Sequence, residues 1–153
     1  MSVQPIPEGY RTLTPYLSVR DAAAAIAFYA KAFGAVELFR LAMPDGKVAH
    51  AELQLGDSKF MLADENVEWG NLAPPTLGGT PVVMMHYVED VDASFARAVG
   101  AGATVKMDVM THFYGDRAGT VIDPFGHQWM IATHVEDVDP ADMQARMAGA
   151  MMA

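Results

Sequence analysis

Two residues with acid–base chemistry, His50 and Glu52, lie two positions apart in the first half of the chain. Side chains two positions apart in an extended strand point to the same face of a sheet. Because imidazole titrates near neutral pH, His50 and Glu52 could act as a base and a proton holder. The same pattern also fits a salt-linked pair on a partly wet sheet face. Two donors do not make a metal centre, so a divalent metal is expected only at a non-standard site that starts from this pair.

Aromatic and methionine side chains are the next candidates for ligand contacts. Trp69, Phe113 and Tyr114 lie in segments without strand or helix periodicity. Together they could clamp a flat ligand, or they could simply cover the hydrophobic core. A wall of flexible thioethers, which accommodates varied ligand shapes, would come from Met61, Met85 and Met130. Ordinary core packing gives the same pattern.

The other titratable residues favour structural roles. We expect His86 in the core and both His127 and His134 at the surface. His112 differs from these, because it lies in a loop that could cover a cavity mouth and contact a ligand. The adjacent Asp116 and Arg117 are interpreted as an internal ion pair at a strand end. Alternatively, Arg117 contacts a ligand carboxylate.

Composition excludes several classes of function. The chain has 153 residues, of which 52% are hydrophobic, with a formal net charge of −9 and no cysteine. The acidity argues against nucleic acid as a partner and favours a cationic small molecule over an anionic one. Without cysteine there are no disulfides or thiolate sites. The first residues do not resemble a signal peptide, and no apolar run approaches the roughly 18 residues of a membrane span, so a cytoplasmic protein without membrane contact is expected.

Hydrophobic periodicity places the candidate residues on a strand–helix–strand–strand–strand unit. Its elements are predicted at residues 13–19, 22–33, 36–43, 48–55 and 59–63. Asp21 is the expected helix N-cap and Gly34 the expected stop. A loop rich in proline and glycine follows up to Thr80.

The same order of elements returns in the second half of the chain. The predicted strand at 82–88, the helix after Asp90 and the strands at 104–107, 117–122 and 127–133 match the first unit, with Asp21 and Asp90 shifted by 69 positions. We interpret this as a duplicated βαβββ unit, the alternative being two unrelated α+β halves. A further helix is predicted at 141–148, after Asp139 and Pro140.

Three stretches resemble a known superfamily. They are Tyr16–Asp21 leading into the alanine-rich helix that ends at Gly34-Ala35, the run His50-Ala51-Glu52-Leu53 with Gly56-Asp57-Ser58, and Gly115-Asp116-Arg117 through Asp123–Trp129. The chain resembles the vicinal oxygen chelate superfamily, which includes glyoxalase I, bleomycin-resistance proteins and extradiol dioxygenases, and within it the PhnB-like branch. The resemblance implies an α+β fold of two tandem βαβββ modules that form a curved mixed sheet around a cavity, commonly in a homodimer.

The metal site that this superfamily implies does not carry over to this chain. The positions that correspond to its histidine and glutamate ligands are Thr14, Met61, Val83 and Met130, and none is a normal ligand for the divalent metals concerned. A register shift of one residue does not supply a set of ligands either. No cofactor is therefore expected.

These observations predict one domain over residues 1–153. It would consist of a first module at 10–64, a linker loop at 65–80, a second module at 81–136 and a C-terminal helix and tail at 137–153. The leading hypothesis is a metal-free protein that binds a small apolar or cationic organic molecule. The expected ligand contacts are Thr14, Tyr16, Met61, Trp69, Met85, Phe113, Tyr114 and Met130. Whether it is an enzyme stays open. The alternatives are a glyoxalase-like lyase or isomerase that uses His50 and Glu52 for proton transfer, and a dimeric binding module without catalysis.

Overall fold

The computed structural model describes residues 2–152, which form two four-stranded mixed sheets with helices. The strand orders are β1-β4-β3-β2 and β5-β8-β7-β6, so the same connectivity occurs twice. The chain divides into two compact units. One extends to Thr80 and includes Pro124–Gly126, while Pro81–Asp123 and the residues from His127 onward form the other. The predicted α+β class and its tandem βαβββ modules are confirmed.

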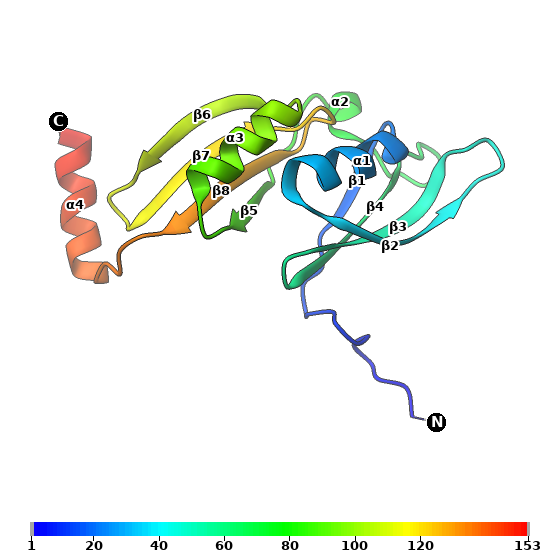
Figure 1. The fold of residues 1–153 in the computed structure, drawn as a ribbon, viewed down its shortest axis with the longest axis horizontal. Helices are drawn as coiled ribbons and strands as arrows, with labels where there is room; N and C mark the ends of the chain where they lie inside the picture. Colours follow the sequence, from blue (N-terminus) through cyan, green and yellow to red (C-terminus); the bar gives the residue numbers. More distant parts are fainter. Residues whose placement is uncertain (1, 153) are drawn as a thin grey trace. The chain divides into compact units, whose positions relative to one another are not determined.

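The first unit holds the elements that position His50 and Glu52. In chain order these are β1 (Tyr16–Val19), α1 (Ala22–Phe33), β2 (Val36–Ala42), β3 (Val48–Leu55), β4 (Ser58–Asp64) and the short helix α2 (Pro74–Leu77). Strand β1 is parallel to β4, and the β4-β3-β2 ladder is antiparallel. In Figure 1, α1 covers one face of this sheet.

The second unit repeats this arrangement. It contains β5 (Val83–Tyr87), α3 (Val91–Ala101), β6 (Thr104–Thr111), β7 (Asp116–Ile122), β8 (Gln128–His134) and α4 (Pro140–Met152). Helix α3 lies across its sheet as α1 does across the first (Figure 1).

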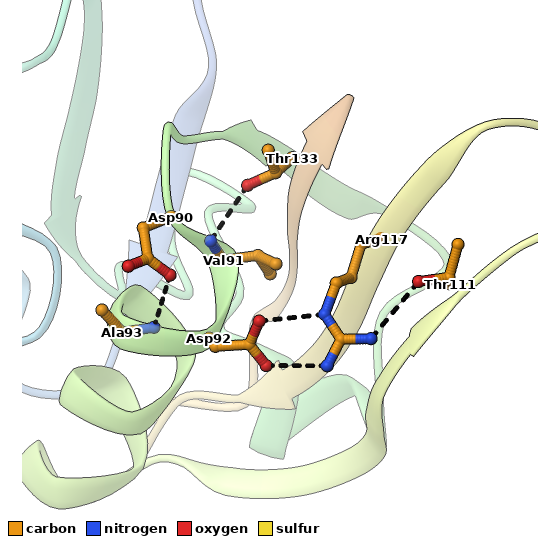
Figure 2. Close-up of polar contacts among 7 residues, drawn as sticks. All are labelled: Asp90, Val91, Asp92, Ala93, Thr111, Arg117 and Thr133. Atoms are coloured by element: carbon orange, nitrogen blue, oxygen red, sulfur yellow. Dashed lines mark hydrogen bonds and ion pairs between the residues drawn. The ribbon is translucent and has the colours of Figure 1, made fainter. Parts of the chain in front are cut away.

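Helices α1 and α3 begin with the same polar contacts. Asp21 accepts a hydrogen bond from the Ala24 amide at 3.0 Å, and Asp90 accepts one from the Ala93 amide at 3.1 Å. In both helices the first backbone amide donates a hydrogen bond to a side chain near the end of a sheet strand. That strand, β4 or β8, runs parallel to the strand that precedes the helix. Ala22 donates to Asp64 at 3.0 Å, and Val91 donates to Thr133 at 2.9 Å (Figure 2).

The helix-facing side of each sheet forms a core. Residues of α1 such as Ile26 and Tyr29 are buried with Leu53 and Leu62 of the sheet. Since side chains alternate along a strand, the residues between these core positions point to the other side. We call this side of the first sheet, away from α1, its open face.

The core of the second unit contains a buried polar contact. Trp129 is 2% exposed, and its indole N–H donates to the Asp123 carboxylate at 2.9 Å. The second oxygen of that carboxylate accepts from the His127 amide at 3.0 Å. These bonds satisfy a buried carboxylate at the turn that leads into β8.

Several element boundaries differ from the sequence prediction. Strand β1 begins at Tyr16 rather than at Leu13, because Pro15 has no amide hydrogen to extend the ladder. Strand β6 continues to Thr111, where a loop was expected, because bulges between Val105 and Met110 interrupt the alternation that marks a strand. The expected loop after β4 contains α2, and α4 extends beyond the predicted 141–148.

No helix within residues 2–152 is long and apolar enough to cross a membrane.

Candidate functional site

The open face of the first sheet brings together four of the predicted site residues. Met61 of β4 pairs in register with Tyr16 of β1 on one side and with Glu52 of β3 on the other. His50 lies two positions before Glu52 on β3 and therefore shares its face. The prediction that His50 and Glu52 point to the same side is confirmed by the hydrogen bond between them.

A chain of hydrogen bonds links these side chains. The Tyr16 hydroxyl lies 2.8 Å from His50 Nδ1, and His50 Nε2 lies 2.8 Å from Glu52 Oε2. The other carboxylate oxygen of Glu52 accepts a hydrogen bond from the Tyr10 hydroxyl. Because a carboxylate can only accept, His50 donates its Nε2–H to Glu52, and in the tautomer with this single proton Nδ1 accepts from the Tyr16 hydroxyl. Glu52 thus holds the His50 ring in one orientation and one tautomer.

Exposed apolar side chains surround this chain of polar groups. Phe39 pairs with Glu52 and Leu41 pairs with His50 across the β2–β3 ladder. The Phe39 and Tyr16 rings lie 5.8 and 5.5 Å from the His50 ring, measured between centroids. Phe39, Leu41 and Tyr16 are each about half exposed. Partial burial raises the pKa of the Tyr16 phenol, so that it stays a hydrogen-bond donor at neutral pH.

The other predicted ligand contacts lie elsewhere. Thr14 is half-buried just before β1. Trp69 is exposed in the loop after β4 and belongs to the same unit. Met85 and Met130 pair in register on the second sheet, at positions equivalent to Tyr16 and Met61.

Phe113 and Tyr114 form an aromatic turn between β6 and β7. Their rings meet edge to face at 5.4 Å, and the Tyr114 ring stacks on His112 at 5.1 Å. Arg146 of α4 donates to the Phe113 carbonyl at 3.3 Å. Whether these rings clamp a ligand together with Trp69 stays a prediction, because Trp69 belongs to the other unit.

The expected ion pair between Asp116 and Arg117 is wrong. Adjacent residues of a strand point to opposite faces, and each side chain finds a partner on its own side. Arg117 forms a two-bond ion pair with Asp92 of α3, both bonds at 2.9 Å, and also donates to Thr111 (Figure 2).

Asp116 is instead the centre of a second polar cluster, at the start of β7. Its buried carboxylate accepts from the Tyr87 hydroxyl at 2.7 Å and from His134 Nδ1 at 2.8 Å. His134 also contacts Asp137 through Nε2 at 2.7 Å. The hydrogen bonds to Asp116 and then to Asp137 raise the pKa of His134. His134, expected as a surface residue, is half exposed but takes part in this cluster.

Of the other histidines, His86 packs on the helix side as expected. Its ring meets Trp129 edge to face at 6.4 Å between centroids. Burial lowers the pKa of His86, because charging the ring there costs solvation.

The donor set of the superfamily's metal site is a poor match to this structure. Of the four corresponding positions, Met61 and Met130 offer thioethers, and neither Thr14 nor Val83 offers an imidazole or carboxylate. Both ring nitrogens of His50 are already hydrogen-bonded, one to Glu52. Within residues 2–152, no group of three or more histidine, aspartate or glutamate side chains is arranged to hold a metal ion.

Sequence reasoning missed Tyr10 and the Asp116 cluster. Tyr10 lies in an N-terminal segment without regular structure, 42 residues before the Glu52 carboxylate that it contacts. No local pattern marks such a contact. The Tyr87–Asp116–His134 cluster could have been sought by asking which polar side chains share the helix-free face of the second sheet.

Comparison with known proteins agrees with this architecture. The model of the Glyoxalase/Bleomycin resistance protein/Dioxygenase superfamily matches residues 12–131. An uncharacterized protein of Mycobacterium bovis is 47% identical over 139 residues, which cover 89% of this chain and 91% of the relative. An uncharacterized protein of Arabidopsis thaliana is 34% identical over 116 residues, covering 71% of this chain and 69% of the relative.

Solved structures show the same fold. The TioX protein of Micromonospora sp. ML1 is similar with a TM-score of 0.66 and 24% identity, covering 82% of this chain and 99% of that one. The Arabidopsis thaliana At5g48480 gene product is similar with a TM-score of 0.65 and 29% identity, covering 80% and 98%. The duplicated βαβββ topology and the family match together show that the chain belongs to the Glyoxalase/Bleomycin resistance protein/Dioxygenase superfamily.

Proposed function

We propose that the chain binds a small organic molecule on the open face of its first sheet, without a metal ion. The observation that supports this most is the hydrogen-bonded chain Tyr16–His50–Glu52 set among exposed apolar side chains. A few converging polar groups in an apolar surrounding are typical of small-molecule sites. As part of this proposal we assign the chain to the PhnB-like branch, on the motifs around His50 and Asp123.

The polar groups define the ligand that fits best. The ligand would have an apolar body to lie against Phe39, Leu41 and Met61, and a donor or cationic group to approach the Glu52 carboxylate. The net charge of −9 adds a long-range attraction for cations over anions. The Tyr16 hydroxyl can also donate to an acceptor on the ligand when it turns away from His50.

The metal-independent part of the proposal depends on the donor set. Four positions that would supply imidazole or carboxylate ligands hold threonine, valine and two methionines. Elemental analysis of protein purified without chelators is expected to find no stoichiometric Ni, Fe, Mn or Zn. One such ion held per chain would overturn this part.

A thermal-shift screen with organic cations and neutral aromatic compounds tests the binding part. Ligands that bind the folded state raise its melting temperature. We expect compounds that stabilise the native chain to lose this effect in Tyr16→Phe and His50→Ala. Gln54→Ala is the matched control, since Gln54 is on the same strand and bonds to the Gly56 carbonyl instead. An equal loss in the control, or no loss in either variant, would contradict the proposed site.

The same geometry supports a second candidate, a proton-transfer enzyme of the lyase or isomerase class. With Tyr16 turned toward a substrate carbonyl oxygen, His50 Nδ1 could take a proton from the adjacent carbon while Glu52 stabilises the imidazolium through Nε2–H. Deuterium exchange into α-hydroxy ketones in D₂O, followed by NMR, separates the candidates. Exchange that disappears in His50→Ala supports the enzyme, and absence of exchange with retained binding supports the binding protein.

We also propose that the protein is a homodimer, as the superfamily resemblance implies, and that it is cytoplasmic. Sedimentation equilibrium at micromolar concentration tests the oligomeric state. A monomer mass would contradict it.

A further inference from the structure

The first unit contains a pocket of about 420 Å³ that the proposed site does not use. It lies between the β2–β3 turn and the loop that follows β4. Its lining includes Val48, Ala49 and Ala63, and none of Tyr16, His50 and Glu52 lines it. The volume is within the range of pockets that hold small organic molecules.

Both walls of the pocket are held by local hydrogen bonds. In the loop after β4, Asn66 and Asn71 exchange two backbone bonds of 2.8 and 2.9 Å, and the Trp69 amide donates to the Asn66 side chain at 3.2 Å. In the β2–β3 turn, Lys47 donates its amide to Asp45 at 3.0 Å. The Trp69 indole is therefore presented from an ordered loop, although it is 75% exposed.

An exposed indole at the rim of a pocket needs an explanation. Tryptophan is normally buried for most of its area, as Trp129 is. Exposing the Trp69 ring leaves its π face open to a cation, and tryptophan is the best aromatic partner for cations.

The charges of the lining indicate which kind of ligand fits. Four carboxylates and one ammonium group line the pocket: Asp45, Asp64, Glu65, Glu68 and Lys47. Three of the carboxylates are committed to the fold, since Asp45 accepts from the Lys47 amide as described above. Asp64 accepts from the Ala22 and Val48 amides, and Glu65 accepts from the Ala73 amide beside Arg20. Hydrogen bonds from Thr76 and then Ala73 lower the pKa of Glu65, so it stays charged.

Glu68 adds a negative charge to the lining of the same pocket. It is exposed and adjacent to Trp69 in the chain. A ligand cation over the indole would therefore face an acidic rim, and an anion would be repelled.

We infer that this pocket is a second binding site, selective for an organic ammonium ion that packs against Trp69 and is attracted by Glu68. This inference goes beyond the proposed function, because no residue that lines the pocket belongs to the His50–Glu52 site. The pocket would bind a compact aromatic or aliphatic ammonium ion with modest affinity, since cation–π contacts at exposed sites are weak.

Three probes of similar size test the selectivity. Benzyltrimethylammonium, benzyl alcohol and benzoate are titrated into the full chain, and binding is followed by amide shifts in ¹H–¹⁵N spectra. We expect the cation to bind most tightly and to shift the amides of residues 66–71. Equal binding of benzoate, or shifts confined to other segments, would overturn the inference.

Two variants with matched controls test the residues. Trp69→Ala should weaken benzyltrimethylammonium binding about two- to fivefold, and Glu68→Gln about two- to threefold at low salt. Leu77→Ala and Glu8→Gln remove an exposed apolar side chain and a charge outside the pocket lining, and should leave binding within experimental error. Because all four side chains are exposed, the variants should fold, which circular dichroism checks.

His50→Ala should leave the shifts that benzyltrimethylammonium causes at residues 66–71 unchanged, even where it removes binding at the His50–Glu52 site. If His50→Ala weakens binding of the cation at residues 66–71 as much as Trp69→Ala does, the two sites are one and the inference is wrong. If Trp69→Ala and Leu77→Ala behave alike, the indole has no part in binding and the inference is also wrong.

Discussion

Replacing Glu52 by glutamine tests whether this carboxylate organises the polar chain on the first sheet. Glu52 accepts from both Tyr10 and His50, and bonds to a charged acceptor contribute roughly 1 kcal/mol more than bonds between neutral groups. The side chain of Glu52 is only 16% exposed. We expect the free energy of unfolding to fall by about 1–2 kcal/mol, which is large compared with ordinary surface changes.

The tautomer of His50 is the sharper measurement for the same variant. The carboxylate requires the proton on Nε2, whereas the glutamine amide of the variant would present either its oxygen or its NH₂ group to the ring. Long-range ¹H–¹⁵N spectra of the imidazole should show one tautomer, Nε2–H, in the native chain and a mixture in Glu52→Gln. Asp57→Asn controls for the lost charge, because it removes an exposed carboxylate of the β3–β4 turn that accepts from the neighbouring Ser58 hydroxyl. A native chain with Nδ1 protonated, or a variant with an unchanged tautomer and urea midpoint, would refute the reasoning.

Three further predictions concern the second unit. Asp123→Ala removes the acceptor of the buried Trp129 indole, so urea unfolding should show a loss of about 2–3 kcal/mol. The hydrogen bond to Asp116 raises the pKa of His134. The contribution of His134 to stability should therefore be complete below the unfolded pKa of about 6.5 and should disappear as pH rises through the folded pKa. An NMR titration of the ring and melting curves at several pH values measure this. Arg117→Met removes an exposed ion pair and should leave the urea midpoint nearly unchanged, because solvent screens the two charges; a clear drop of the midpoint would mean that the pair is not solvent-screened.

Hydrophobic periodicity predicts those features of the fold that depend on residues close together in the sequence. The shared face of His50 and Glu52 follows from the period of two in a strand, and both helix starts follow from a capping aspartate, Asp21 or Asp90. Each of these statements concerns residues within a few positions of one another. The structure confirms them because no distant contact overrides the local preference.

Contacts across the chain could not be predicted in the same way. The bond from Tyr10 to Glu52 joins residues that no repeat relates, and the bulges in β6 hide its length. The error at Asp116 and Arg117 had a different cause, since opposite charges next to each other suggested a pair that strand geometry forbids. Applying the same period of two to these residues would have corrected it from the sequence alone.

The two modules share the same strand order, but the sheet faces that point away from their helices carry different side chains. In the first sheet Met61 lies between Tyr16 and Glu52, and in the second sheet Met130 lies between Met85 and Thr120 in the same register. The helix side of each sheet must pack a core, which constrains both copies in the same way. On the opposite side the two copies differ, because only the first carries a tyrosine and a carboxylate beside this methionine. A ligand that needs these groups must therefore engage the first module in a way that the second cannot reproduce, which predicts that Met85→Ala affects ligand binding less than Tyr16→Ala does.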